Sequence, residues 1–234
     1  MFKAITHGKM ARWIGDDGQP HSAQSVYRDL EDHLTAAVFA RLSYLPRDVF
    51  WLLLSSALDQ VPPQLRHRPS LQSIDFWPTY NHEDGTRCEP DILLRFDDVD
   101  VLVEAKRYDD SEWQTRDQLQ AEIESYNNEY PDRPDPFCLL VSGRQPSDLS
   151  LLENHAGTLR TTWLALRYAA RTARDEMSRE LDHGHWRRVL QDIEEALGLH
   201  GVAPRALFSD LSDTLGERIR RLGSTGQLWV TGTN

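Results

Sequence analysis

Two apolar, β-favouring segments joined by an acidic dipeptide are the feature that most constrains how this chain can fold. The first segment runs from Asp91 to Phe96 and the second from Val99 to Lys106, with Asp97-Asp98 between them. Aliphatic runs that flank a short polar turn are typical of a β-hairpin. We therefore expect the hydrophobic residues of both segments to lie in the interior of a sheet.

Periodicity elsewhere in the chain predicts helices on either side of further strands. Ser111 and Gln114 have the spacing of a capping box at the start of one of these helices. The predicted helices cover residues 22–45, about 48–58, 111–130, about 174–181, 186–197 and 206–222. The predicted strands cover residues 71–77, 91–96, 99–106, 137–141 and 161–166. This order predicts an α/β fold with a mixed central β-sheet flanked by α-helices.

The chain is expected to form one core with two appendages. Residues 1–21 are polar and contain glycine, so we expect a flexible N-terminal arm. Residues 22–170 hold the predicted sheet with its helices and form the core. Residues 171–234 are expected to form a C-terminal helical extension packed on that core.

Composition limits the classes of function. The 234 residues are 39% hydrophobic and 27% charged, as in ordinary globular proteins. No apolar run is long enough to cross a membrane, so we expect no membrane partner. Cys88 and Cys138 are the only cysteines, which fits a reducing compartment and predicts a cytoplasmic protein. The absence of a G-x-x-x-x-G-K-[ST] motif predicts that no nucleotide cofactor is used.

The net charge of −11 argues against a broad basic surface that would bind nucleic acid by itself. The arginine clusters of the later helices are predicted to be solvated helix faces. The seven tryptophans are scattered, and we predict that they are core residues. His183 and His185 have no cysteine or acidic partner at zinc spacing, so we predict no metal pair there.

Lys106 stands out because the chain uses arginine at almost every other basic position. Among 26 Lys and Arg residues, only positions 3, 9 and 106 carry lysine. The lysine ammonium is compact and its pKa can shift on burial, whereas arginine is always charged and forks its donors. A lysine at this position suits a site that binds a water or a phosphate beside carboxylates.

Strand alternation places Glu104 and Lys106 on one face of the second segment and Ala105 on the other. A two-residue turn puts Asp91 opposite Glu104, whereas a four-residue turn puts it opposite Lys106. Either register brings the three polar residues together at the open end of the hairpin. Facing carboxylates repel, and a hard divalent cation would offset that repulsion. We therefore expect Mg²⁺ as cofactor, with Mn²⁺ able to replace it.

Glu89-Pro90-Asp91, followed after twelve residues by Glu104-Ala105-Lys106, resembles the PD-(D/E)xK phosphodiesterase superfamily of restriction and repair nucleases. The resemblance covers about residues 22–170 and implies a restriction-endonuclease-like sheet. It implies that Asp91 and Glu104 are metal ligands, with the Ala105 main-chain carbonyl as a third. It also implies that Lys106 lies beside the attacking water.

Members of that superfamily usually carry an acidic residue on the helix before the sheet, and many carry a glutamine on the helix after the lysine. Glu31 lies at the border of the predicted buried face and is the expected acid, with Asp32 as the alternative. Gln114 and Gln118 are four residues apart and share a helix face. Gln118 is the expected glutamine.

The resemblance therefore implies a metal-dependent DNA endonuclease that cleaves phosphodiester bonds by in-line water attack, in bacterial defence against foreign DNA. Its predicted catalytic residues are Asp91, Glu104, Lys106, Glu31 and Gln118. The acidic surface suggests that a protein partner or a homodimer contributes to DNA binding. Two alternatives stay open, namely a catalytically inactive interaction subunit of a larger defence or repair complex and a nuclease that acts on RNA.

Overall fold

The computed structural model describes the central part of the chain and short pieces near the N-terminus. The described residues are 9, 12–15, 18–22, 27, 31–81, 87–107, 116–143, 157–177 and 184–202. The helices are α3 (Glu31–Leu42), α4 (Arg47–Ala57), the short 3₁₀ helix η1 (Pro63–Leu65), α5 (Arg116–Glu129), α6 (Trp163–Met177) and α7 (Gly184–Leu199). The strands are β1 (Arg12–Ile14), β2 (Pro20–Ser22), β3 (Leu71–Phe76), β4 (Tyr80–Asn81), β5 (Arg87–Cys88), β6 (Ile92–Phe96), β7 (Asp100–Ala105), β8 (Phe137–Ser142) and β9 (Thr158–Thr162).

A five-stranded mixed sheet forms the centre of the fold. Its strand order is β3-β6-β7-β8-β9, with antiparallel pairing from β3 to β7 and parallel pairing from β7 to β9. Parallel neighbours need a long connection, and α5 supplies it between β7 and β8. The sheet and its helices confirm the predicted α/β class.

The β6–β7 hairpin has the two-residue turn. Arg95 lies opposite Asp100, and the Phe96 N–H donates to the Val99 carbonyl at 2.9 Å. The four-residue alternative is therefore wrong. Continuing the observed register toward the open end of the hairpin places Asp91 opposite Glu104.

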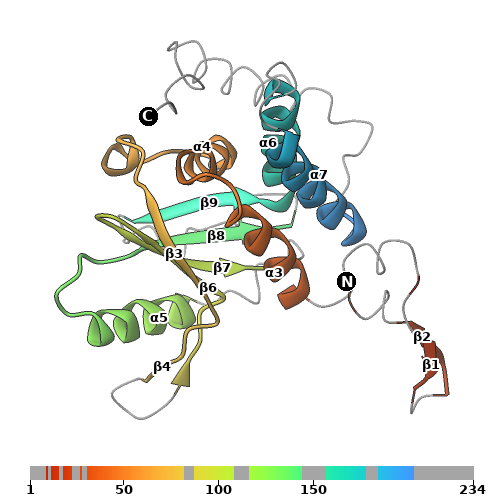
Figure 1. Ribbon diagram of the computed structural model, residues 1–234. Coiled ribbons are helices and arrows are strands. Elements are labelled where there is room, and N and C mark those ends of the chain that lie inside the picture. Colours follow the sequence, from red (N-terminus) through yellow and green to blue (C-terminus); the bar gives the residue numbers. More distant parts are fainter. Residues whose placement is uncertain are drawn as a thin grey trace.

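Helices cover both faces of the sheet (Figure 1), with α3, α4, α6 and α7 on one face and α5 on the other. Alternate strand residues divide between the two layers. Leu94 and Val103 belong to the larger cluster, whereas Leu93 and Leu102 pack under α5. Because both faces are covered, the strands read as nearly continuous apolar runs.

The predicted strand over residues 161–166 is wrong in its second half. β9 ends at Thr162, and α6 begins at Trp163 instead of near residue 174. The Thr162 hydroxyl accepts a hydrogen bond from the Ala165 N–H at 2.9 Å, so this side chain caps the helix. α6 also runs without a break across residue 170, where the core was expected to end.

The predicted helix over residues 22–45 is too long at both described ends. Ser22 belongs to β2, which pairs with β1 in a small hairpin that extends one residue past the expected N-terminal arm. At the other end α3 stops at Leu42, and the N–H groups of Tyr44 and Leu45 bond to carbonyls three residues back. These tighter bonds are typical of a closing 3₁₀ turn.

Helix α7 packs on the core through its buried residues Leu190, Ile193 and Leu197. The predicted capping box of Ser111 and Gln114 and the predicted helix over 206–222 lie outside the described residues. Among the helices that the structure describes, none combines the length and the hydrophobicity needed to cross a bilayer.

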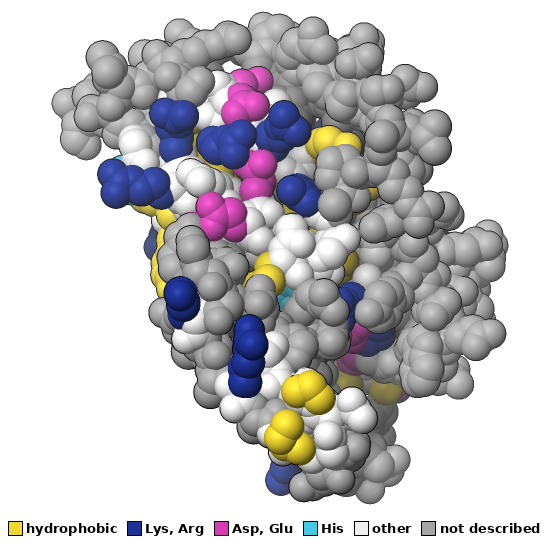
Figure 2. All heavy atoms as spheres, turned by 90° about the vertical axis from the view of Figure 1, so that its right-hand side faces the viewer, with side chains coloured by type: hydrophobic (Ala, Val, Ile, Leu, Met, Phe, Trp, Pro, Cys, Tyr) yellow, Lys and Arg dark blue, Asp and Glu magenta, His cyan; other side chains and the backbone are white. Residues whose placement is uncertain are grey.

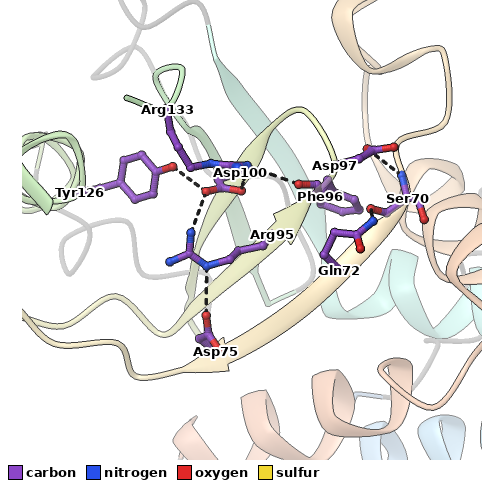
Figure 3. Close-up of polar contacts among 9 residues, drawn as sticks. All are labelled: Ser70, Gln72, Asp75, Arg95, Phe96, Asp97, Asp100, Tyr126 and Arg133. Carbon is purple, nitrogen blue, oxygen red and sulfur yellow. Dashed lines mark hydrogen bonds and ion pairs between the residues drawn. The ribbon is translucent and has the colours of Figure 1, made fainter. Parts of the chain in front are cut away.

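A buried carboxylate ties the turn end of the hairpin to α5 (Figure 3). The fully buried Asp100 side chain accepts hydrogen bonds from Arg133 Nη2 at 2.6 Å and from the Tyr126 hydroxyl at 2.6 Å. Arg95 Nη1 lies 3.3 Å from the same carboxylate, and the Arg95 guanidinium lies 4.3 Å over the Tyr130 ring. A buried charge is tolerated when such partners satisfy it.

We expect Asp100→Ala to lower the free energy of unfolding by about 2–4 kcal/mol, because it leaves two partly buried guanidinium groups without their common carboxylate. Urea unfolding followed by circular dichroism measures the loss. Asp75→Ala is the matched control, since the exposed Asp75 carboxylate pairs with the same Arg95 at 3.3 Å. Its expected cost is about 1 kcal/mol or less, and equal losses in both variants would contradict a special role for Asp100.

Candidate functional site

The carboxyl end of β7 is the point where the predicted site residues meet. The Ala105 N–H donates to Asp91 Oδ2 at 2.8 Å, which fixes the Asp91 carboxylate across the open end of the hairpin. The Lys106 N–H donates to the Val141 carbonyl at 2.7 Å and extends the parallel ladder one residue past the strand. The carboxyl ends of parallel strands are common positions for ligand sites.

Glu104 lies at the centre of the site and is only 4% exposed. Its Oε1 accepts hydrogen bonds from Lys106 Nζ at 2.6 Å and from Gln118 Nε2 at 2.9 Å. The first donor comes from the same strand and the second from α5. Glu104 therefore contacts Lys106, which was expected beside it, and also Gln118, the glutamine that the resemblance implies.

Glu31 reaches the same place from α3, on the opposite side of the sheet from α5. Its Oε1 lies 3.4 Å from Lys106 Nζ, and its Oε2 accepts from the Arg107 N–H at 2.7 Å. The alternative acid, Asp32, is exposed. Glu31 on α3 can reach Lys106 because Lys106 lies just past the end of β7.

The main chain around Lys106 is held from a third side. The indole Nε1 of the buried Trp163 donates to the Lys106 carbonyl at 2.9 Å. With the Lys106 N–H bonded to Val141 as well, both main-chain polar groups of Lys106 have partners. The direction of its side chain is therefore set by a rigid backbone.

Glu122 is a member of the site that sequence reasoning missed. Gln118 Nε2 donates to Glu122 Oε1 at 2.9 Å, so the Gln118 amide bridges Glu104 and Glu122. Glu122 is 1% exposed, and its Oε2 has no hydrogen-bond partner among the described residues. Its spacing of four residues from Gln118 on one helix face is the signal that could have identified it.

The surroundings of these carboxyl groups shift their pKa values upward. Burial raises the pKa of Asp91 to about 7, with a further contribution from Glu104, while the Ala105 N–H and Lys106 act in the other direction. Burial likewise raises the pKa of Glu122 to about 8, again helped by Glu104. Titratable groups with shifted pKa values that share one location are typical of functional sites.

Lys106 keeps its proton. Burial lowers the pKa of its ammonium, but the Glu104 carboxylate and, to a smaller extent, Glu31 outweigh that effect and raise the pKa above its ordinary value. The Lys106 side chain is therefore a positive charge at neutral pH rather than a base.

The two cysteines are free, as predicted, and neither is suited to act as a nucleophile. Burial and the Glu122 charge raise the pKa of the Cys88 thiol to about 11 and that of Cys138 to about 12. A reactive cysteine needs a lowered pKa. Both side chains therefore serve packing.

A hard divalent cation fits this set of donors. The carboxyl groups of Asp91, Glu104 and Glu122 are close enough that Glu104 raises the pKa values of the other two, and one buried Glu122 oxygen has no partner among the described residues. In the same part of the chain, no three His, Cys, Asp or Glu side chains are arranged to hold a metal by themselves. Mg²⁺ does not require such a cage, because one or two carboxylates with water and substrate phosphate complete its shell.

Comparison with known proteins gives an alignment that covers most of the chain. The chain is 27% identical over 219 residues to the uncharacterized protein PM0110 of Pasteurella multocida (strain Pm70), which covers 88% of this chain and 82% of that protein. No protein-family model matches the chain, and no solved structure matches it.

The buried Glu122 carboxyl predicts a dependence of stability on pH. Its folded-state pKa of about 8 exceeds the ordinary value of 4.5, so the folded protein binds more protons than the unfolded chain between these values. The free energy of unfolding therefore falls as pH rises through this window. We expect the stability of Glu122→Gln relative to the wild type to rise as pH increases from 4.5 to about 8. Above that range the difference should stay constant.

Urea unfolding in EDTA at a series of pH values measures this difference. Glu124→Gln is the matched control, because Glu124 is exposed on the same helix and accepts a hydrogen bond from Gln120 at 2.7 Å. The control is expected to keep the pH dependence of the wild type. A difference between Glu122→Gln and the wild type that is constant with pH would contradict the prediction.

Proposed function

We propose that this protein is a divalent-metal-dependent nuclease with a restriction-endonuclease-like fold that hydrolyses phosphodiester bonds in DNA. The observation that carries the proposal is the convergence of Asp91, Glu104 and Lys106 at the carboxyl end of β7. Glu31 and Gln118, which the resemblance to the PD-(D/E)xK superfamily also implies, contact the same group of atoms. A surface ion-pair patch would not need a Glu104 that is 4% exposed.

Asp91, Glu104 and the Ala105 main-chain carbonyl are the groups proposed to hold Mg²⁺. When bound, the cation would supply Lewis-acid stabilisation of the phosphoryl group. The protein contributes orientation, because the Ala105 N–H holds the Asp91 carboxylate and the Gln118 amide holds that of Glu104. Fixed donors avoid reorganisation when the substrate reacts.

Lys106 is proposed to orient the attacking water and to balance the negative charge that develops on the phosphoryl oxygens. Its raised pKa argues against a role as general base at neutral pH. Glu31 and Glu104 hold the ammonium between them, with contacts of 3.4 Å and 2.6 Å. These contacts limit the positions that the ammonium can reach.

The charge pattern of the surface favours DNA binding that involves more than one protein chain. Figure 2 shows Lys and Arg side chains interleaved with Asp and Glu over the part of this face where α6 and α7 lie. One such pair joins Arg174 Nη1 to Glu194 Oε1 at 2.7 Å. Alternating charges do not make a continuous track for phosphates. We therefore propose that a protein partner or a second copy of the chain contributes to DNA binding, in bacterial defence against foreign DNA.

The alternative is an interaction subunit that keeps the fold without catalysis. The 2.6 Å contact between Lys106 Nζ and Glu104 Oε1 is also what a purely structural ion pair would show. The net charge of −11 favours a basic protein partner over nucleic acid. Activity measurements distinguish the two functions.

Lys106→Ala is expected to reduce metal-dependent DNA cleavage by at least about 100-fold, because the ammonium beside the reacting phosphate is lost. Lys106→Arg is expected to lose cleavage as well, since a planar guanidinium does not replace a compact ammonium. Plasmid, linear duplex, single-stranded DNA and RNA are incubated with each protein in Mg²⁺, Mn²⁺ or EDTA, with circular dichroism as the test of folding. Arg188→Ala, an exposed change on α7, is the control that retains cleavage.

Each alternative predicts a different result in this assay. Preferential cutting of RNA would favour an RNA nuclease. If the wild-type protein cuts no substrate, alone or with the proteins encoded beside it, the interaction subunit is favoured. DNA cutting that survives both EDTA and Lys106→Ala would contradict the proposed site.

Asp91→Asn is expected to remove stabilisation by metal while keeping the fold. Its amide oxygen can still accept from the Ala105 N–H, and the change relieves repulsion with Glu104 above the Asp91 pKa of about 7. In EDTA the variant should therefore melt no lower than the wild type. Mg²⁺ should raise the Tm of the wild type by mass action and leave that of the variant unchanged.

Thermal denaturation over a series of Mg²⁺ concentrations measures this effect without any assay of activity. Asp32→Asn is the matched control, because Asp32 is an exposed acid next to Glu31. The control should show the wild-type response to Mg²⁺. The same Mg²⁺-induced rise in Tm in Asp91→Asn would argue against a role for Asp91 in binding the ion.

A further inference from the structure

Trp77 departs from the prediction that the tryptophans are core residues. Trp51 and Trp163 are at most 2% exposed, but Trp77 is 36% exposed. It directly follows β3, and its ring lies 5.7 Å from that of Phe76. Part of a large aromatic surface therefore faces solvent at the end of the edge strand that pairs with β6.

The Trp77 backbone adopts a conformation that bulky residues rarely take. Its φ is 48°, and Arg68 is the one other non-glycine residue with positive φ in the described part of the chain. A proline follows Trp77, and the residue before proline favours an extended backbone with negative φ. Strain of this kind persists only where the surrounding structure imposes it, and it gathers at functional sites.

A main-chain hydrogen bond connects this residue to the candidate site. The Trp77 N–H donates to the Asp91 carbonyl at 3.0 Å, one step beyond the paired residues Phe76 and Ile92. Adjacent strands lie about 4.8 Å apart, so the Trp77 backbone is the immediate neighbour of a proposed metal ligand. In the proposed nuclease, a nucleotide whose phosphate binds at Asp91 would therefore lie near Trp77.

We propose that Trp77 is a stacking platform for an unpaired base of the DNA strand bound at this site. The inference rests on the proposed nuclease function and specifies its substrate class, since a base inside an intact duplex has no free face for an indole. Base stacking on tryptophan is independent of sequence and contributes substantially to the affinity for single strands. The preferred substrate therefore carries unpaired nucleotides at the cleavage position.

The test compares binding of a fluorescein-labelled single-stranded oligodeoxynucleotide with binding of a blunt duplex of the same sequence. Fluorescence anisotropy is recorded in Mg²⁺ for full-length proteins that carry Lys106→Ala to prevent cleavage. Trp77→Asn removes the ring, and asparagine tolerates positive φ, so the variant is expected to melt no lower than its parent. Trp77→Phe keeps an aromatic face.

Trp77→Asn is expected to bind the single strand about tenfold more weakly and the duplex with unchanged affinity, while Trp77→Phe loses less. Tyr44→Ala is the matched control, because Tyr44 is 65% exposed but lies past the far end of α3 from Glu31. It should change neither affinity.

Other results would overturn the inference. Unchanged single-strand binding by Trp77→Asn, together with DNA cleavage by the wild type, would reject the platform and leave the nuclease proposal intact. A lowered Tm with equal losses on both DNAs would assign Trp77 a structural role. A wild-type protein that neither binds nor cuts DNA would overturn both proposals.

Discussion

Strand β7 is hydrogen-bonded along both edges, antiparallel to β6 and parallel to β8, and the arrangement of the site depends on this double pairing. The antiparallel edge brings Asp91 to the Ala105 N–H at 2.8 Å, and the parallel edge continues to the Lys106 N–H at 2.7 Å from the Val141 carbonyl. The carboxyl end of β7 is therefore held in place from both sides, and the Trp163 indole also binds the Lys106 carbonyl. Glu104 and Lys106 therefore project in set directions from a rigid support.

Helix α5 contacts acidic residues at both ends of the hairpin, and the hydrogen bonding of these residues differs between the two ends. At the turn end Tyr126 helps to satisfy Asp100, which also has two arginine partners. At the open end Gln118 bridges Glu104 and Glu122, and one buried Glu122 oxygen lacks a partner among the described residues. The first arrangement stabilises the fold. In the second, burial and neighbouring carboxyl groups oppose ionisation, and a bound cation would favour the ionised forms.

Local patterns predicted the hairpin well, because side-chain alternation and a short polar turn involve residues that are close in sequence. They also placed the candidate acids and the lysine at one end of it. The same rules failed at the β9–α6 junction, where Thr162 is both the last residue of the strand and the cap of a helix that begins at Trp163. Glu122 was missed because a glutamate on an amphipathic helix is usually exposed, whereas this one is buried.

The sequence by itself determined the strand pair, the polar residues at its open end and the α/β class, since each follows from periodicity over a few residues. Only the tertiary structure decided the two-residue register in the folded sheet, the contact between Glu31 and Lys106 and the exposure of Trp77. Those outcomes depend on which elements pack together. Contacts between α3, α5 and the end of β7 join residues that are far apart in the chain, and packing against the sheet selects them.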